Sequence, residues 1–510
     1  MSDLEKIEPE TPIDEVEDVP SARAGRGAAI LGARIVTGAV GLAVAAAVVL
    51  VASVVPLPGI RSEAPTVDVI PVATAQQRVC AGGVLRLGDE SGQDATSATS
   101  IGRPNVTARS TGDVDTSALE QSDSPDAAAR AAPTVLSAAP NAADPAAAVL
   151  LAGAQSQSVD NGDFVGFAAA DCSGASTDSW LVGGSVAVGR TTLITLANPT
   201  EVVSEVALEI FGPDGVVQAP GATGIVVQPQ SQRVLSLASF APGLVSPVIH
   251  VTARGGAVVA NLQQSVVRGL TPGGVEIVGA TAAPAQVQVL PGLVVSGSEE
   301  LESALSEPGN EDLATVLRLY VPGDDALDEG TAVATVAIVA SDGVSTGASF
   351  TADLEIGRVT EVPVEGLTDG TYSVTVTTRL PVVAGLRASS VAPADGENAG
   401  PSDVAWIGAT TKLTGETLVA IAGGPDPVLH LTNPGAESVE VEVRELDGSS
   451  STLTVPARAS ATTVVDAGSA YTLSGFAALY AAVSYSGDGQ LGGYGVQPPA
   501  LASSEITIHP

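Results

Sequence analysis

Apolar and polar residues alternate with a period of two through most of the chain beyond residue 180. Three segments share one order: an alternating strand, a proline, a second alternating strand and an Asp-Gly pair. They start at Leu193, Val316 and Val428. Such alternation puts the apolar side chains on one face of an extended chain, so it predicts half-buried β-strands. The repetition predicts a mainly β protein built from tandem modules.

Turn residues occupy matching places in the three copies. The prolines follow the first strand at Asn198-Pro199, Pro322 and Asn433-Pro434, and the Asp-Gly pairs are Asp214-Gly215, Asp342-Gly343 and Asp447-Gly448. Proline ends a strand because it cannot donate to the hydrogen-bond ladder. Asp-Gly between two strands favours a tight hairpin, since glycine adopts positive φ without steric cost.

The copies also close alike, with VVANLQQSVV from Val258, VVAGLRASSV from Val382 and LGGYGVQPPA from Leu491. LLAGAQSQSV from Leu150 looks like the close of an earlier, degenerate unit. Units of this length with short strands predict three antiparallel β-sandwich modules of immunoglobulin-like size, and a β-propeller is the alternative. The predicted modules are residues 183–283, 284–402 and 403–510.

Residues 56–182 form a different region, predicted as a proline-containing spacer followed by a degenerate, low-complexity module. From Asp89 to Asp144 the residues are mostly Ala, Ser, Asp, Thr and Pro. This composition predicts a loop with at most short helical turns. Trp180 and Trp406 precede two of the copies at equivalent places, which favours packing in a core or at a module junction over ligand stacking.

An uncharged apolar run, Ile35 to Val55, stands near the N-terminus. Its length of 21 residues corresponds to roughly 30 Å of helix, the thickness of a bilayer core. Arg23, Arg26 and Arg34 precede the run and only Arg61 follows closely, which predicts a cytoplasmic N-terminus. We therefore expect an acidic cytoplasmic tail at 1–34, one transmembrane helix at 35–55 and an extracytoplasmic remainder. A cleaved signal peptide is the alternative.

The chain is strongly acidic, with 57 Asp and Glu against 21 Lys and Arg and a net charge of −36. This charge repels phosphate backbones, so nucleic acid is not an expected partner. The expected partners are the membrane and either envelope proteins or cell-wall polymer. Lys6 and Lys412 are the two lysines, and this bias with abundant Ala, Gly and Val suggests a GC-rich genome.

Cys80 and Cys172 are the two cysteines. Both follow the apolar run, on the side where thiols can be oxidised. They predict one disulfide, and two buried free thiols are the alternative. No zinc-type spacing links them to His250, His430 or His509, so neither a metal nor another cofactor is predicted.

The layout resembles an uncharacterised family of single-span exported proteins from high-GC Gram-positive bacteria, a domain of unknown function. The resemblance rests on the acidic tail and arginine-flanked anchor, the Cys80 and Cys172 pair, DCSGASTDSWLVGG from Asp171 and the strand LANP from Leu196. The family carries no known catalytic residues, so the resemblance implies no site.

Two motifs invite a chemical interpretation. Gly343 to Gly347 reads G-x-S-x-G around Ser345, but a nucleophile elbow needs a strand followed by a helix, and strands flank this motif on both sides. Asp324, Asp325, Asp328 and Glu329 form an acidic loop that could attract Ca²⁺, although the spacing is not that of an EF-hand. A turn and a solvated loop are the simpler interpretations.

These observations predict a membrane-anchored, non-catalytic envelope protein that acts as a scaffold or accessory in cell-surface assembly. A ligand-binding or sensing ectodomain for cell-wall material is the first alternative. An envelope hydrolase is the second, and no convergent catalytic set supports it.

Overall fold

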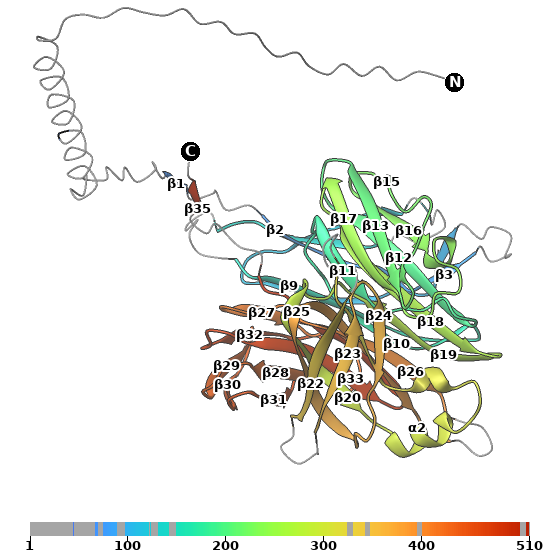
Figure 1. Ribbon diagram of the computed structural model, residues 1–510. Helices are drawn as coiled ribbons and strands as arrows, with labels where there is room; N and C mark the ends of the chain where they lie inside the picture. Colours follow the sequence, from blue (N-terminus) through green and yellow to red (C-terminus); the bar gives the residue numbers. More distant parts are fainter. Residues whose placement is uncertain are drawn as a thin grey trace, which may run out of the picture. The chain divides into compact units, whose positions relative to one another are not determined.

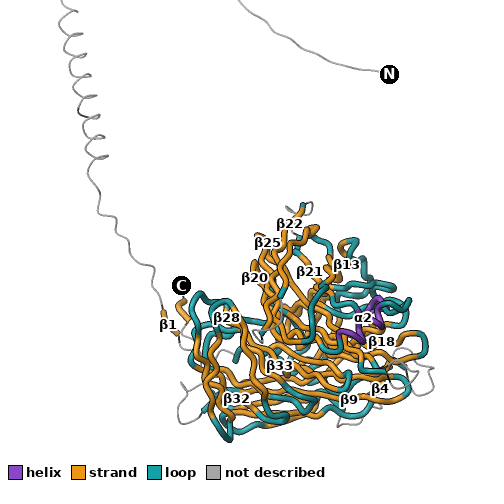
Figure 2. The backbone as a smooth tube through the Cα atoms, turned by 90° about the horizontal axis from the view of Figure 1, so that it is seen from below, coloured by secondary structure: helices purple, strands orange, loops and turns teal. Residues whose placement is uncertain are grey.

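The computed structural model describes most of the chain between residues 75 and 499. The described residues are 44, 67–69, 75–88, 97–121, 123, 131–141, 149–323, 330–341, 347–394, 400–499 and 506–508. Strands make up most of this part (Figure 2), and the helices in it are α2 (Ser298–Leu305) and the 3-10 turns η1 (Leu237–Ser239) and η2 (Glu311–Leu313). The sequence prediction of a mainly β protein with several antiparallel sheets is confirmed.

Two short end strands, β1 (Val67–Val69) and β35 (Ile506–Ile508), pair with each other in a body separate from residues 70–504. No helix in the described ranges is long and apolar enough to cross a membrane. The predicted span at 35–55 lies outside those ranges apart from Val44, and so does the predicted tail at 1–34.

Strand pairing divides residues 70–504 into four modules, which follow one another along the colour scale of Figure 1. Three of them have two main sheets, and in the third module one long strand links both halves into a seven-stranded sheet. The first module has the sheets β2-β8-β6 and β10-β9-β5 and the ribbon β3-β4. Its strands are β2 (Gln76–Cys80), β3 (Leu85–Leu87), β4 (Ala98–Ser100), β5 (Asn105–Ser110), β6 (Asp115–Ala118), β8 (Thr134–Ala138), β9 (Leu151–Asn161) and β10 (Phe164–Asp171).

The predicted loop at 89–144 is wrong for the described residues of that stretch, because β4, β5, β6 and β8 lie there together with β7 (Glu120–Gln121). Small side chains let these strands lie close to their neighbours while their backbones complete existing sheets. The few large apolar residues point inward: Leu136 is fully buried and Val135 is 3% exposed. The strands could not be recognised from the sequence, because Ala, Ser and Thr differ little in hydrophobicity and give no clear alternation of apolar and polar positions.

The second module pairs the sheet β11-β17-β13-β14, with β15 beside β13, against the sheet β19-β18-β12-β16-β7. The strands are β11 (Asp178–Val182), β12 (Arg190–Asn198), β13 (Ser204–Gly212), β14 (Gly215–Val216), β15 (Ile225–Val227), β16 (Ser231–Ser236), β17 (Val248–Gly255), β18 (Val259–Arg268) and β19 (Thr271–Val278). Strand β7 of the preceding segment joins this sheet in parallel with β16.

The third module depends on one long strand, β25 (Gly370–Val391). The first half of β25 pairs with β20 and β22, and the second half pairs with β21 and β26, so the strand passes from one sheet to the other. The remaining strands are β20 (Ala285–Val295), β21 (Val316–Tyr320), β22 (Thr331–Ala340), β23 (Ala348–Glu355), β24 (Val359–Pro363) and β26 (Ser402–Gly408).

The fourth module has the sheets β27-β32-β29-β30 and β31-β28-β33-β34. Its strands are β27 (Thr417–Ala420), β28 (Val428–Asn433), β29 (Val439–Glu445), β30 (Ser450–Val455), β31 (Ala459–Val464), β32 (Ala470–Ser474), β33 (Tyr480–Gly487) and β34 (Gln490–Gly495). The predicted boundary between residues 402 and 403 falls inside β26, because β26 forms a hairpin with β25 and not with the strands that follow it.

The Asn-Pro pairs have the same structural role in the second and fourth modules. Asn198 ends β12, and its Nδ2 donates to the carbonyls of Val202 (2.8 Å) and Val227 (3.2 Å). Asn433 ends β28, and its Nδ2 donates to the carbonyls of Glu437 (2.8 Å) and Val455 (3.3 Å). One buried amide therefore ties the strand end to the next loop in both copies, which explains why the repeat keeps asparagine there.

Each module closes with a hairpin whose last strand lies at a common axis. These four closing strands are β10, β19, β26 and β34, and each contacts the next, with β34 returning to β10. A closing strand pairs with its own module on one edge, so its other edge presents unpaired N–H groups to the axis. The ring therefore needs acceptors at its centre.

Asp403 on β26 supplies the first acceptor. It is 1% exposed, and its two carboxylate oxygens accept one backbone N–H from each closing strand. The donors are Phe167 (2.8 Å), Val275 (3.4 Å), Val404 (2.9 Å) and Leu491 (3.1 Å). One side chain thus joins all four modules.

Glu276 on β19 is a second buried acid on the axis and accepts N–H groups from two of the closing strands. It is fully buried, and its Oε1 accepts the N–H groups of Ile277 (2.8 Å) and Ala169 (3.4 Å). Its Oε2 has no hydrogen-bond partner in the described structure. Burial is the largest cause that raises the pKa of Glu276 well above its usual value, and the nearby Asp403 adds to the rise.

Two glycines let the closing strands approach Asp403. Gly166 on β10 and Gly274 on β19 have φ angles of +152° and +126°. A Cβ at Gly166 would lie 2.5 Å from Oδ1 of Asp403, and one at Gly274 would lie 3.0 Å from the same atom. Any larger residue would displace the carboxylate from its donors.

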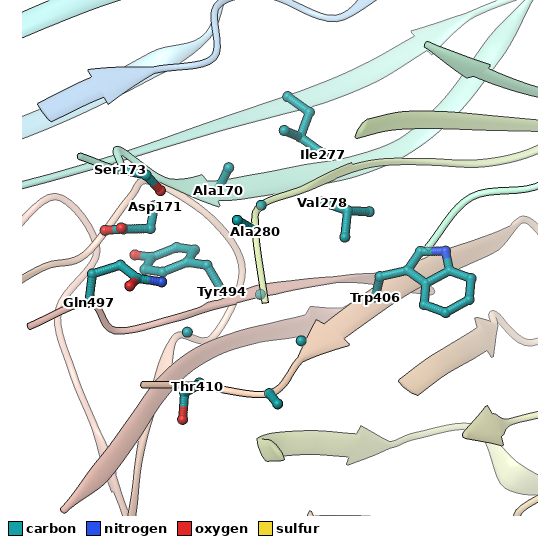
Figure 3. A pocket seen from close by; sticks show the side chains of 15 residues that line it. Ala170, Asp171, Ser173, Ile277, Val278, Ala280, Trp406, Thr410, Tyr494 and Gln497 are labelled. Atoms are coloured by element: carbon teal, nitrogen blue, oxygen red, sulfur yellow. The ribbon is translucent and has the colours of Figure 1, made fainter. Parts of the chain in front are cut away.

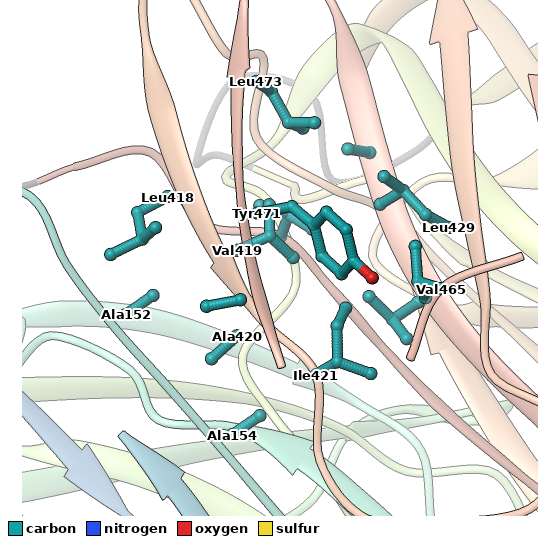
Figure 4. Close-up of a cluster of buried hydrophobic side chains, with 14 of the residues drawn as sticks. Ala152, Ala154, Leu418, Val419, Ala420, Ile421, Leu429, Val465, Tyr471 and Leu473 are labelled. Carbon is teal, nitrogen blue, oxygen red and sulfur yellow. The ribbon is translucent and has the colours of Figure 1, made fainter. Parts of the chain in front are cut away.

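The first and last modules also share a core, which completes the ring. Ala152 and Ala154 of β9 pack in one buried cluster with Leu418, Val419 and other apolar residues of the fourth module (Figure 4). Nearby, a guanidinium N–H of Arg78 donates to the carbonyl of Pro498 at 2.7 Å. Residues more than 250 positions apart in the printed sequence are therefore direct neighbours.

We predict that Asp403→Asn destabilises the protein by roughly 2–5 kcal/mol, because an amide nitrogen replaces one acceptor oxygen and leaves buried N–H groups unpaired. Urea unfolding followed by circular dichroism measures the change. Asp353→Asn on the exposed face of β23 is the matched control and should shift the free energy of unfolding by less than about 0.5 kcal/mol. Equal stabilities for the two variants would contradict the role of Asp403.

Candidate functional site

The structure brings together only some of the residues that the sequence singled out. Cys80 and Cys172 form the predicted disulfide, next to buried Leu136 and Leu151. Residues 324–329 and Ser345 lie outside the described residues. Strands β22 and β23, on either side of Ser345, pair antiparallel, so the described elements that flank the motif are two strands and not a strand and a helix.

The two histidines in the described residues, His250 and His430, do not converge, and His509 lies outside those residues. His250 stacks on Trp180 with ring centroids 4.2 Å apart and contacts Asp178 and Glu209. His430 is buried in the fourth module, where burial lowers its pKa to about 4. No group of three or more His, Cys, Asp or Glu residues in the described part could hold a metal ion.

A small cavity lies on the axis beyond Glu276. It encloses about 40 Å³ and is lined by the four closing strands and the residues that directly follow them. Figure 3 shows Asp171, Ser173, Tyr494 and Gln497 gathered on one side and Trp406 on the other. Such a volume holds a water molecule or a small ion but no organic ligand. Burial raises the pKa of Asp171 to about 7, against the opposing influence of Arg78.

A much larger groove lies between the second and third modules and encloses about 1140 Å³. We call it the arginine groove. Its walls come from the loop before β12, from β18, from the segment around η2 and from β24 and β25. The lining includes Val188, Arg190, Val245, Gln264, Arg268, Pro308, Asp312, Glu361, Pro363 and Arg387.

Arg318 on β21 lies beneath the floor of the groove and supports it. It is fully buried and donates two N–H groups to Oε1 of Glu361, at 2.9 and 2.7 Å. Its Nη1 donates to the carbonyls of Gly184 (3.0 Å) and Pro247 (2.9 Å), both in the second module. Burial lowers the pKa of Arg318 to about 10, which still leaves the guanidinium charged at neutral pH.

Asp312 in η2 forms the second ion-pair cluster of the groove. Arg268 donates to both of its oxygens, at 2.9 and 2.7 Å, and Arg190 contacts Oδ1. Burial alone would raise the pKa of Asp312, but the hydrogen bonds and charges of the two arginines lower it. Since two arginines share one carboxylate, this cluster is formally positive.

Arg387 on β25 is the arginine of the groove without a carboxylate partner among the described residues. It is 8% exposed, its Nη2 donates to the carbonyl of Ala314 at 3.3 Å, and its Nε has no partner. Its guanidinium carbon lies 5.9 Å from the ring centre of Trp406. A buried charge of this kind is costly unless something in the groove compensates it.

Both tryptophans lie at the junction between the second and third modules, as the sequence predicted. Trp180 packs with Tyr320 and Val383 of the third module. Trp406 enters the core of the second module, where its Nε1 donates to Gln264 at 2.6 Å, and the Arg318 guanidinium lies 4.5 Å from its ring centre. They therefore hold the two walls of the groove together.

Sequence reasoning missed Arg318, Arg387, Glu276 and Asp403. A signal was present for three of them, because Arg318, Glu276 and Asp403 are each the one charged residue of a largely apolar strand, as in VLRLYV and GGVEIV. Charged residues are almost never fully buried unless they are paired. A search for such isolated charges would have found the axis and the groove floor together.

The model of a family of unknown function, DUF5719, matches residues 121–468. This is more than half of the chain. The chain belongs to this family. The DUF5719 match begins in β7 and ends before β32, so it includes Arg318, Arg387 and Asp403 but not Cys80. No curated protein matches the chain.

We predict that raising the pH from about 4 to about 8 reduces the stability of this DUF5719 protein. Burial raises the pKa of Asp171 to about 7 in the folded state, above the 3.8 expected when unfolded. The contribution of Asp171 is therefore complete below pH 3.8 and is lost as pH rises through about 7, by at most about 1.4 kcal/mol per pH unit. Urea unfolding across this range measures the slope. Asp171→Asn should flatten it, and an unchanged slope in that variant would contradict the account.

We further predict that Arg318→Met destabilises the protein by about 3–5 kcal/mol, because it leaves the largely buried Glu361 carboxylate and two carbonyls without donors. The double variant Arg318→Met with Glu361→Leu should recover part of this loss, since it removes the unpaired charge. Thermal unfolding of the three proteins tests the pair. Additive effects of the two substitutions would show that Arg318 and Glu361 do not depend on each other.

Proposed function

We propose that this protein is a membrane-anchored, extracytoplasmic and non-catalytic component of the cell envelope. In this proposal residues 35–55 form a single span with a cytoplasmic N-terminus, in a high-GC Gram-positive bacterium. The Cys80–Cys172 disulfide is the observation that supports export most directly, because disulfides persist in oxidising compartments. The acidic surface fits a protein that avoids nucleic acid.

We propose further that the exported part acts as a scaffold or accessory in cell-surface assembly. Each two-sheet module would be an immunoglobulin-like β-sandwich, and the ring would hold the four sandwiches in fixed relation. Asp403 supports this view, since it joins one strand from every module. A scaffold needs such fixed geometry. If the connections between modules were flexible, ordering the modules on binding would cost entropy and weaken the affinity for a partner.

The arginine groove favours a second candidate, a ligand-binding or sensing ectodomain for cell-wall material. A groove of about 1140 Å³ is large enough for a sizeable organic ligand. The two candidates differ in what the groove contacts: a scaffold uses outer surfaces toward proteins, whereas a sensor uses the groove toward wall polymer.

Protease added to intact protoplasts tests the topology. We expect degradation of everything after residue 55 and survival of a small N-terminal fragment, together with full-length chain in the membrane fraction. Protection of the region around Trp406 would contradict the proposed orientation, and a shortened soluble chain would indicate a cleaved signal peptide.

Crosslinking of the envelope followed by pull-down separates the functional candidates. Protein partners without binding to purified cell wall support the scaffold, and saturable wall binding supports the sensor. Turnover of an ester, peptide or glycan substrate by the pure protein would overturn both.

A further inference from the structure

We propose that the arginine groove binds an oxyanion, a carboxylate or phosphate group of an extended ligand, on the guanidinium of Arg387. This inference goes beyond the proposed function and does not depend on export or on a scaffold role. It rests on the hydrogen bonding, the charge and the shape of the groove.

The hydrogen bonding of Arg387 is incomplete. A guanidinium carries five N–H donors in a rigid fork that matches carboxylate and phosphate. The described residues satisfy one of them, through the carbonyl of Ala314, and the buried Nε faces no acceptor. Arg190, Arg268 and Arg318 all have carboxylate partners in the same place, so the missing partner of Arg387 is specific to that residue.

The charge of the groove is opposite to that of the whole protein. Arg190, Arg268 and Arg387 line the groove together with the carboxylates of Glu311, Asp312 and Glu361. Arg318, which is bound to Glu361 beneath the lining, adds one positive charge. The chain as a whole carries −36 with 21 cationic side chains. About a fifth of its cations are therefore concentrated at this groove. The charges of Glu361 and Asp312 act on Arg387, but both carboxylates are bonded to other arginines, so the guanidinium of Arg387 keeps donors for an incoming anion.

The rim of the groove indicates that the ligand is more than a bare ion. Val188 is 94% exposed and Val245 is 53% exposed at its edge, and Pro308 and Pro363 also line it. Exposed apolar side chains around a polar floor favour a ligand with an apolar portion next to its anionic group. The groove is also far larger than a single phosphate or carboxylate requires.

Tryptophan fluorescence of the full-length chain in detergent tests the proposal, because Trp406 lies against Arg387. The probes are inorganic phosphate and N-acetylalanine, which supply the two oxyanions separately. We expect a saturable change with at least one probe, at a dissociation constant on the order of 1 mM. Saturation by phosphate alone assigns a phosphate-bearing ligand, and saturation by N-acetylalanine alone assigns a carboxylate. A saturable response to neither probe overturns the proposal.

Variants separate binding at Arg387 from binding elsewhere. Arg387→Met should weaken the probe at least about tenfold, and Arg387→Lys should retain part of the affinity. Arg444→Met, at an exposed ion pair on β29, should bind like the wild type. An undiminished response in Arg387→Met would overturn the proposal.

The thermal stability of the same variants is an independent test of the proposal. If Arg387 serves a ligand, Arg387→Met without probe should melt at the same temperature as the wild type or higher, because an unpaired buried charge has been removed. A clear fall in melting temperature would mean that Arg387 supports the fold, and it would overturn the proposal.

Discussion

The Asp403 carboxylate is the interaction on which the arrangement of the four modules depends. Each module ends its inner sheet with an edge strand, and an edge strand left open is a site for wrong pairing. Most proteins cover such edges with a helix or close a barrel. Here four edges face each other, and a buried acid takes one N–H from each. Glu276 accepts N–H groups from two of these strands, β10 and its own β19.

The sequence predicted the local features of this fold well, because short-range geometry determines them. Asn198-Pro199 and Asp447-Gly448 end a strand and make a turn whatever surrounds them. The ring could not be predicted in this way. Whether Asp403 is solvated or buried depends on β10, β19 and β34, which lie far from it in the sequence. The strands of the first module were not predicted for another reason: their small residues show no hydrophobic periodicity.

The groove illustrates a second limit of sequence reasoning. Net charge describes the average surface, and an average of −36 gives no hint that four arginines meet in one place. They come from β12, β18, β21 and β25, and only the packing of the second module against the third brings them together. The two tryptophans were recognisable as junction residues, but the arginines beside them were not. Pairing across a junction is a property of the assembled chain.

The shared core of the first and fourth modules has a consequence for how the protein folds. Ala152 and Ala154 reach their apolar neighbours only when the residues around Leu418 have been synthesised. The first module therefore keeps its small core and its unpaired edge strand exposed until the residues of the fourth module are present. Contacts over such sequence distances slow folding and prolong the exposure of unpaired strands. The Cys80–Cys172 bond lies within the first module and can form early, so it would hold that module together during the delay.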